Sequence, residues 1–94
     1  MKHMRVVRFR LNTDHRGTDR AIADDMVPGL KQQPGCSGAY FASNGDGECA
    51  LVVLWDSAEQ ADAAAQIFSP KLMGHVGGKT SAPPDIHLLP ILAD

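Results

Sequence analysis

The side chains of this sequence that could do chemistry begin with two arginines and a histidine. A guanidinium binds carboxylates and other anionic oxygens, so Arg8 and Arg10 could hold an acidic or enolate-like small molecule. An imidazole titrates near neutral pH, so His75 could move a proton or bind a metal. We therefore take Arg8 and His75 as candidate catalytic residues and Arg10 as a candidate substrate contact. The alternatives are arginines paired between subunits or exposed at a sheet rim, and an exposed histidine in a loop.

Three further side chains could contact a substrate. Trp55 shares one strand face with Leu51, so the two could form a wall of an apolar cavity. Tyr40 is the only phenol in the chain and is the third candidate. The alternative for all three is packing, with the indole of Trp55 anchoring a strand to a helix.

Several other kinds of chemistry are disfavoured. The four histidines lack the spacing of metal ligands, so we expect no metal site. Residues 74–80 look like a phosphate-binding loop, but the first glycine of that motif falls on Met73 and no strand precedes it. The net charge of -2 argues against nucleic acid as a partner. No apolar run is long enough to span a membrane or to form the core of a signal peptide, so we expect a cytoplasmic protein.

The strand expected at 49–55 is the strongest structural signal in the chain, because it is apolar at every position. A strand covered on one face alternates apolar and polar residues, whereas an unbroken apolar run indicates cover on both faces. Strands are also expected at 4–11, 36–43 and 86–92, and Pro90 limits the last of these to a sheet edge.

Two helices are expected between these strands. The first begins with Thr18 as its cap and is kinked or restarted at Pro28. The second begins with a capping box from Ser57 to Gln60, and it is broken at Pro70. The segment 74–84 that follows is rich in Gly and Pro and is expected to be a flexible loop.

A turn at 44–47 joins two of the strands in a hairpin and sets the expectation for the two cysteines. This turn would pair Ser43 with Glu48, which places Cys36 and Cys49 far apart along the hairpin. We therefore expect two free thiols and a reducing compartment. At the start of the chain, residues 1–3 are consistent with an expression remnant.

The order strand, helix, strand, strand, helix, strand predicts a single α+β domain of 94 residues, a ferredoxin-like βαββαβ sandwich. Two helices can cover only one face of a four-stranded sheet. The apolar strand at 49–55 requires cover on the other face as well, and a second copy of the sheet would supply it. We therefore predict a homodimer packed sheet to sheet.

Three parts of the sequence resemble the antibiotic-biosynthesis-monooxygenase family. They are Gln33-Pro34-Gly35-Cys36, the turn Asp46-Gly47, and the run LWDSAEQA over 54–61, and the resemblance extends over about residues 5 to 73. It implies a dimeric α+β barrel. It also implies cofactor-independent oxygenation of a small aromatic or polyketide-like substrate in an apolar cavity.

Individual positions refine what the resemblance implies. The oxygenase branch of the family has a Trp where Trp55 stands, but an Asn and a Tyr where this chain has Leu51 and Ala61. The haem-degrading branch carries a ligand His in a region similar to that around His75. The implied functions are thus a monooxygenase-like enzyme, a non-catalytic dimeric module that binds a small ligand, or a haem-binding protein that uses His75.

Overall fold

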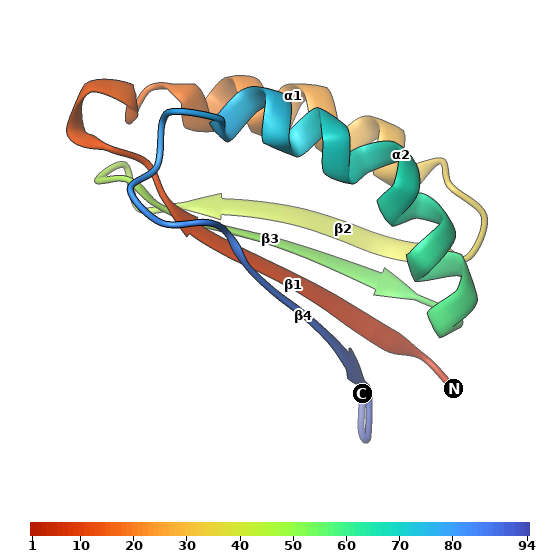
Figure 1. Ribbon diagram of the computed structural model, residues 1–94. Coiled ribbons are helices and arrows are strands. Elements are labelled where there is room, and N and C mark those ends of the chain that lie inside the picture. Colours follow the sequence, from red (N-terminus) through yellow and green to blue (C-terminus); the bar gives the residue numbers. More distant parts are fainter.

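Four antiparallel strands form one sheet, and two helices lie against one of its faces (Figure 1). The computed structural model describes residues 1–94. The elements in chain order are β1 (His3–Arg10), a short 3-10 helix (Thr13–His15), α1 (Thr18–Lys31), β2 (Cys36–Ser43), β3 (Glu48–Trp55), α2 (Ala58–Val76) and β4 (Asp85–Pro90). The strands are ordered β2-β3-β1-β4 across the sheet. This arrangement confirms the predicted ferredoxin-like α+β fold.

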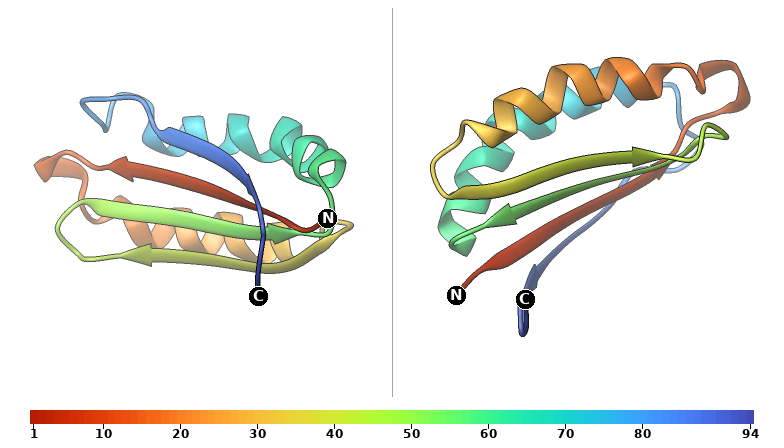
Figure 2. Two further views of the ribbon diagram at one scale, coloured as in Figure 1. Left: turned by 90° about the horizontal axis from the view of Figure 1, so that it is seen from below. Right: turned by 180° about the vertical axis from the view of Figure 1, so that it is seen from behind.

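The helices form a single layer, and the opposite face of the sheet is uncovered (Figures 1 and 2). α1 packs on β2, and α2 lies beside α1 and packs on β1 and β3. β4 forms the edge of the sheet next to β1, as Pro90 predicted. No helix of the protein is long and apolar enough to cross a membrane.

β3 alternates in burial as the apolar run predicted. Its odd-numbered side chains face the helices and are buried, among them Leu51, Val53 and Trp55. The even-numbered ones face the uncovered side and are half-buried: Ala50, Val52 and Leu54. The same parity holds on β1, where Val7 and Phe9 join the core.

The observed register of the β2–β3 hairpin differs from the predicted one by one residue. Ser43 pairs with Cys49 and not with Glu48, because the turn is one residue longer than expected. A bulge between Cys36 and Gly38 then shifts the register back, so Cys36 does lie opposite Trp55. The two cysteines are at opposite ends of the hairpin, and both are free.

Both helices run through prolines that were expected to interrupt them. α1 is continuous through Pro28, and α2 is continuous through Pro70 as far as Val76. Both prolines are exposed, so water can hydrate the carbonyl that loses its hydrogen bond. The expected restart at Pro28 and break at Pro70 are therefore wrong.

The starts of the helices also differ in part from expectation. The residue that caps α1 is Gly17 and not Thr18, and it makes no side-chain capping bond. At α2, the Ser57 hydroxyl accepts a hydrogen bond from the Gln60 N–H at 3.3 Å, as predicted. The reciprocal half of the capping box is absent, because the Ser57 hydroxyl donates to the Gln60 side-chain oxygen at 3.1 Å.

The segment after α2 is shorter than the loop predicted at 74–84. Its first residues continue the helix, so the irregular part begins at Gly77. The middle of the segment is tied to the end of β1, because Leu11 pairs with Thr80 and the N–H of Asn12 donates to the carbonyl of Lys79.

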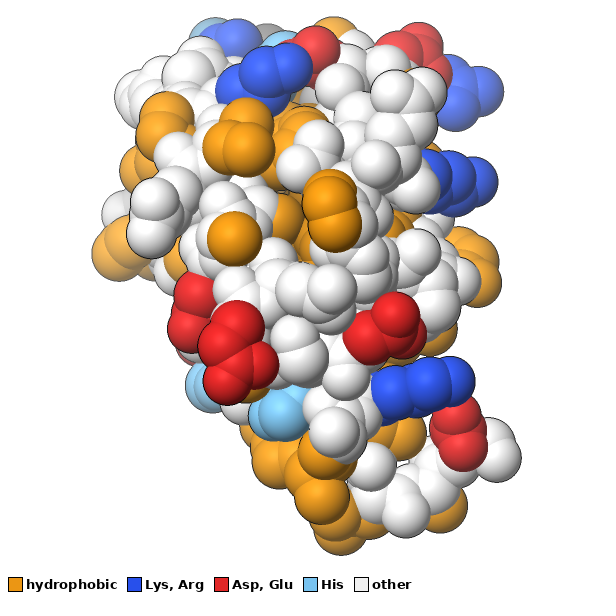
Figure 3. Space-filling view, turned by 90° about the vertical axis from the view of Figure 1, so that its right-hand side faces the viewer, with side chains coloured by type: hydrophobic (Ala, Val, Ile, Leu, Met, Phe, Trp, Pro, Cys, Tyr) orange, Lys and Arg blue, Asp and Glu red, His pale blue; other side chains and the backbone are white.

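Apolar side chains are also exposed near the C-terminus. Figure 3 shows hydrophobic side chains gathered at the bottom of the molecule, below the layer of helices. Leu89 on β4 is 47% exposed and Leu92 beyond it is 90% exposed. The uncovered apolar surface therefore extends from the open face of the sheet to its β4 edge.

Candidate functional site

A small apolar cavity of about 40 Å³ lies between the two helices and the inner face of the sheet. Eleven of its 13 lining residues are hydrophobic, and they come from β1, α1, β3 and α2. Trp55 and Leu51, two of the residues singled out in the sequence, both line it. Because about 10–15 Å³ is enough for one water molecule by this kind of measure, the cavity has room for about three.

The small residues of α2 create this space. Ala61 and Ala64 face the sheet and are fully buried, and both line the cavity. Phe68, one turn further along, lines it as well. The Ala-rich face predicted from the sequence therefore keeps the helix close to the sheet without filling the volume beneath it.

Arg5 is the charged residue of the cavity wall, and the sequence analysis missed it. It precedes Val7 and Phe9 by two and four residues, so strand parity alone would have placed it on the helix-facing side. Its Nη2 lies 3.1 Å from Oδ1 of Asp62 on α2, and its side chain is only 19% exposed. The Nε atom of Arg5 is buried and has no hydrogen-bond partner.

Trp55 presents a second unpartnered donor. It is 1% exposed, and its indole Nε1 is buried without a partner. Its position at the end of β3 places it opposite His3 of β1 and Cys36 of β2. A buried indole N–H normally finds an acceptor, so an unpaired one is an exception in a folded protein.

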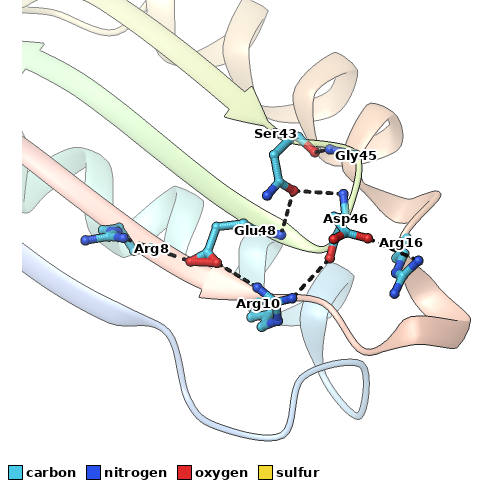
Figure 4. A network of polar contacts seen from close by, with 8 residues as sticks. Arg8, Arg10, Arg16, Ser43, Gly45, Asp46 and Glu48 are labelled. Atoms are coloured by element: carbon cyan, nitrogen blue, oxygen red, sulfur yellow. Dashed lines mark hydrogen bonds and ion pairs between the residues drawn. The ribbon is translucent and has the colours of Figure 1, made fainter.

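Arg8 and Arg10 lie on the other face of the sheet, away from this cavity. Figure 4 shows both reaching toward Glu48 of β3 near the hairpin turn. The Nη1 atom of Arg10 is 2.8 Å from Oε2 of Glu48, and Nη2 of Arg8 is 3.9 Å from Oε1. Both arginine side chains are about 60% exposed, at 60% and 63%. These arginines are partners of a carboxylate on an exposed surface.

The hairpin turn extends this polar network. Arg16 contacts the Asp46 carboxylate at 3.2 Å, and Arg10 donates to the Asp46 carbonyl at 3.4 Å (Figure 4). The Asn44 side chain accepts hydrogen bonds from the N–H groups of Asp46 and Glu48. The network holds the turn in place, and it leaves no buried charge.

Tyr40 is on the same uncovered face as the two arginines. It is 59% exposed and pairs with Val52 of β3. Its ring lies against Gly38, where an added Cβ would approach the ring carbons within 3.1 Å. Of the six residues singled out in the sequence, the structure thus brings Trp55 and Leu51 to the cavity. It puts Arg8, Arg10 and Tyr40 on the opposite face.

His75 belongs to the last turn of α2 and not to a loop, which corrects the sequence-based expectation. Its Nε2 lies 2.8 Å from Oδ2 of Asp25 on α1, and its side chain is 25% exposed. Lys71, one turn earlier, lies 3.8 Å from the other oxygen of Asp25. The hydrogen bond from His75 and the charge of Lys71 hold the pKa of Asp25 below its ordinary value. His75 does not line the cavity.

The remaining reactive groups form no further site. No cluster of three His, Cys, Asp or Glu residues is placed to hold a metal ion. Cys49 is buried, and desolvation raises the pKa of its thiol. On the cavity wall, the only polar residues are Arg5 and Ser69.

The fold and the cavity define a small ferredoxin-like α+β protein with an apolar site between helices and sheet. No protein-family model matches the sequence, and no curated protein matches it significantly. Many solved structures match it closely in fold, and several of them bear the name antibiotic biosynthesis monooxygenase. The resemblance found in the sequence is thus confirmed at the level of the fold.

Three of these solved structures illustrate the sequence identities and TM-scores of the matches. Rv0793 from Mycobacterium tuberculosis is 23% identical, with a TM-score of 0.83 over 100% of this chain and 98% of that one. A putative antibiotic biosynthesis monooxygenase from Deinococcus radiodurans is 9% identical, with a TM-score of 0.85 over 98% and 94%. The ActVA-Orf6 monooxygenase of Streptomyces coelicolor, solved with the ligand nanaomycin D, is 19% identical, with a TM-score of 0.71 over 98% and 89%.

Proposed function

We propose that this protein is a cofactor-independent, monooxygenase-like enzyme that acts on a small aromatic substrate in the cavity beneath α2. The observation that carries the proposal is the apolar cavity itself, with Trp55 and Leu51 in its wall. Apolar walls with a few polar groups are typical of small-molecule sites. The fold shared with the Streptomyces coelicolor monooxygenase, whose structure holds a small molecule, supports the same reading.

The size of the cavity favours a small substrate over a polyketide of several rings. A volume of about 40 Å³ is less than a single aromatic ring requires, so α2 would have to move away from the sheet on binding. A single ring would demand the least movement. The helix face of alanines, which makes few interlocking contacts with the sheet, would allow it.

The proposed reaction requires an acidic C–H group beside a phenol or enol. Loss of a proton gives a carbanion, which passes electrons to O₂ and forms a C–O bond. The resulting hydroperoxide loses water, so that CH₂ and O₂ become C=O and H₂O. No His, Asp, Glu or Tyr side chain lines the cavity, so the proton would pass to solvent from a substrate that is already acidic.

We also propose that the protein acts as a homodimer packed sheet to sheet. The uncovered face carries half-buried Val6, Val52 and Leu54 at its centre, a pattern that favours cover by another apolar surface. A second copy presents that same surface and so meets it symmetrically. In such a dimer Arg8, Arg10 and Tyr40 would lie at or near the interface.

The assignment of Arg8 and His75 to catalysis stays a prediction. Neither lines the cavity of a single subunit, so chemistry confined to that cavity would not need them. A second subunit could still change the surroundings of Arg8, which lies on the open face of the sheet.

Oxygen consumption tests the proposed function. The substrates should form a size series of acidic phenols and enols, from one ring to anthrone-type ketones. We expect uptake of O₂ with the smaller members, and a strong loss in Trp55→Phe, which removes the indole N–H. If Arg8→Ala and His75→Ala keep their activity, the chemistry is confined to the cavity. If either variant loses activity, the catalytic assignment of that residue is supported. No oxygen uptake with any member would overturn the enzyme proposal.

A second candidate is a non-catalytic module that binds a small apolar ligand. It is favoured by the cavity wall, which offers no proton acceptor, and by Leu51 and Ala61 at the positions where the oxygenase branch has polar residues. Ligand binding without oxygen uptake would support this candidate.

A third candidate function is haem binding through His75, and it would require His75 to give up its hydrogen bond to Asp25. A Soret band on haem titration that disappears in His75→Ala would support it.

A further inference from the structure

We propose that the cavity binds its ligand through an anionic oxygen held by two N–H groups, Nε of Arg5 and Nε1 of Trp55. The favoured ligand class is an aromatic carboxylate, phenolate or enolate, with its ring among the alanines and its oxygen at the Arg5 end. This inference deepens the proposed function and rests on its use of the cavity. It does not depend on the oxygen chemistry.

The first step of the argument concerns hydrogen bonding. The Nε atom of Arg5 and the Nε1 atom of Trp55 are the two buried side-chain polar atoms without a partner in this protein. A buried N–H group without an acceptor is destabilising, because the hydrogen bond it made to water in the unfolded chain is not replaced. Both residues line the same cavity, and both atoms are closed off from water in the unliganded protein. An acceptor that enters as α2 moves away from the sheet could therefore satisfy both groups.

The second step concerns charge. Asp62 pairs with the Nη2 of Arg5 but is itself 67% exposed and does not line the cavity. It orients the guanidinium from the solvent side, leaving Nε without a partner. Apart from Arg5, the cavity wall has no charged group, and its other polar residue is Ser69. A cation would meet only a like charge there, whereas an anion meets a guanidinium in an apolar setting.

The third step concerns shape. Eleven of the 13 lining residues are hydrophobic, so the body of the ligand must be apolar. The limited volume selects a ligand that is small or flat. Benzoate is the smallest aromatic carboxylate and requires the least opening of the cavity.

Binding of three matched probes to the full-length protein tests the inference. The probes are benzoate, toluene and benzylammonium, which share one ring and differ in charge. Titration calorimetry gives the affinity, and the fluorescence of Trp55, the only tryptophan, reports whether the probe reaches the cavity. We expect benzoate to bind at least tenfold more tightly than either other probe, since a hydrogen bond to a charged group is among the stronger ones.

Variants identify the donors. Arg5→Met keeps an apolar stem and removes the guanidinium, and we expect it to lose more than tenfold in benzoate affinity without losing toluene binding. Trp55→Phe, measured by calorimetry, should lose several-fold. Arg20→Met is the control, because Arg20 is exposed on α1 and pairs only with Asp24. Circular dichroism establishes that each variant is folded.

Several outcomes would overturn the inference. These are benzoate affinity no greater than that of toluene, unchanged benzoate affinity in Arg5→Met, or no binding of any probe. The result is separable from the proposed function. Benzoate binding without oxygen uptake would support the anion site and refute the oxygenase function. Oxygen uptake without benzoate binding would support the oxygenase function and refute the anion site.

Discussion

Nε2 of His75 lies 2.8 Å from Oδ2 of Asp25, so the last turn of α2 is hydrogen-bonded to α1. The contact joins the middle of α1 to the last turn of α2. Because Lys71 faces the same carboxylate, Asp25 is paired with two side chains of α2. The two helices are thus linked through Asp25 and Lys71, which are adjacent in sequence to Met26 and Leu72 of the cavity wall.

Asp25→Asn should lower stability near neutral pH and make it less dependent on pH. The pKa of Asp25 is lowered in the folded state, so its stabilisation is present above the pKa of the unfolded chain. It is lost as the pH falls through the folded-state value, below about pH 4. Thermal melts from pH 3 to pH 7 should show the difference between wild type and variant shrinking toward acid. Asp24→Asn is the matched control, since Asp24 pairs only with Arg20 in its own helix. A difference that is constant across this range would contradict the prediction.

Gly35→Ala should destabilise the protein by about 2 kcal/mol, roughly 1 of it from backbone strain and 1 from a lost hydrogen bond. Gly35 has a φ of +82°, and an added Cβ would overlap the side-chain amide of Gln60. Displacing that amide breaks its contact with the Ser57 hydroxyl at the start of α2. Urea unfolding measures the change.

Gly45→Ala is the control for this prediction. Its φ is +77°, but nothing lies within 4 Å of the added Cβ. It should therefore cost only the backbone strain, about 1 kcal/mol. Equal losses at both glycines would show that the Gln60 contact contributes nothing.

Val52→Asp should convert the proposed dimer to a monomer at micromolar concentration. Val52 is half-buried at the centre of the uncovered sheet face, between Tyr40 of β2 and Val6 of β1. A carboxylate there would lose its hydration in the dimer, at a cost on the order of several kcal/mol. Sedimentation or light scattering gives the mass. Ala63→Asp on the exposed face of α2 should leave the dimer intact. A wild-type protein that is monomeric at this concentration would refute the dimer itself.

The two cysteines should differ in reactivity. Cys49 is buried and its thiol pKa is raised, so a thiol reagent should leave it unmodified in the folded protein. Cys36 is half-buried at the sheet edge and should react first. Titration with and without denaturant counts both groups, and Cys36→Ser should abolish the reaction of the native protein. Rapid modification of both thiols under native conditions would contradict the structure.

The architecture could be predicted from the sequence because its signals are periodic. Alternation on β1 and the apolar run on β3 fixed the strands and their inner faces. The prolines were misread because a proline breaks a helix by local rules, whereas packing against the sheet holds α1 and α2 together through Pro28 and Pro70. The same error placed His75 in a loop.

The site was only partly predictable. Trp55 and Leu51 follow from strand parity, but Arg5 was passed over although parity put it beside them. Arg8 and Arg10 were predicted instead because they alternate with Val7 and Phe9, which puts their charges on the face opposite the core. The orphaned N–H groups could not have been predicted, because they depend on the absence of acceptors from other elements.

The two edges of the sheet bear on how copies of this protein could aggregate. The N–H of Ile91 bonds to the carbonyl of Lys2, so the nitrogen of Pro90 points outward, where a further strand would need a donor. On the opposite edge, the bulge near Cys36 disturbs the ladder that an incoming strand would extend. Both edges therefore resist fibril-like growth by strand addition. Crowding this protein in a cell or in a concentrated solution should drive copies together face to face, as closed pairs, and not edge to edge as open-ended polymers.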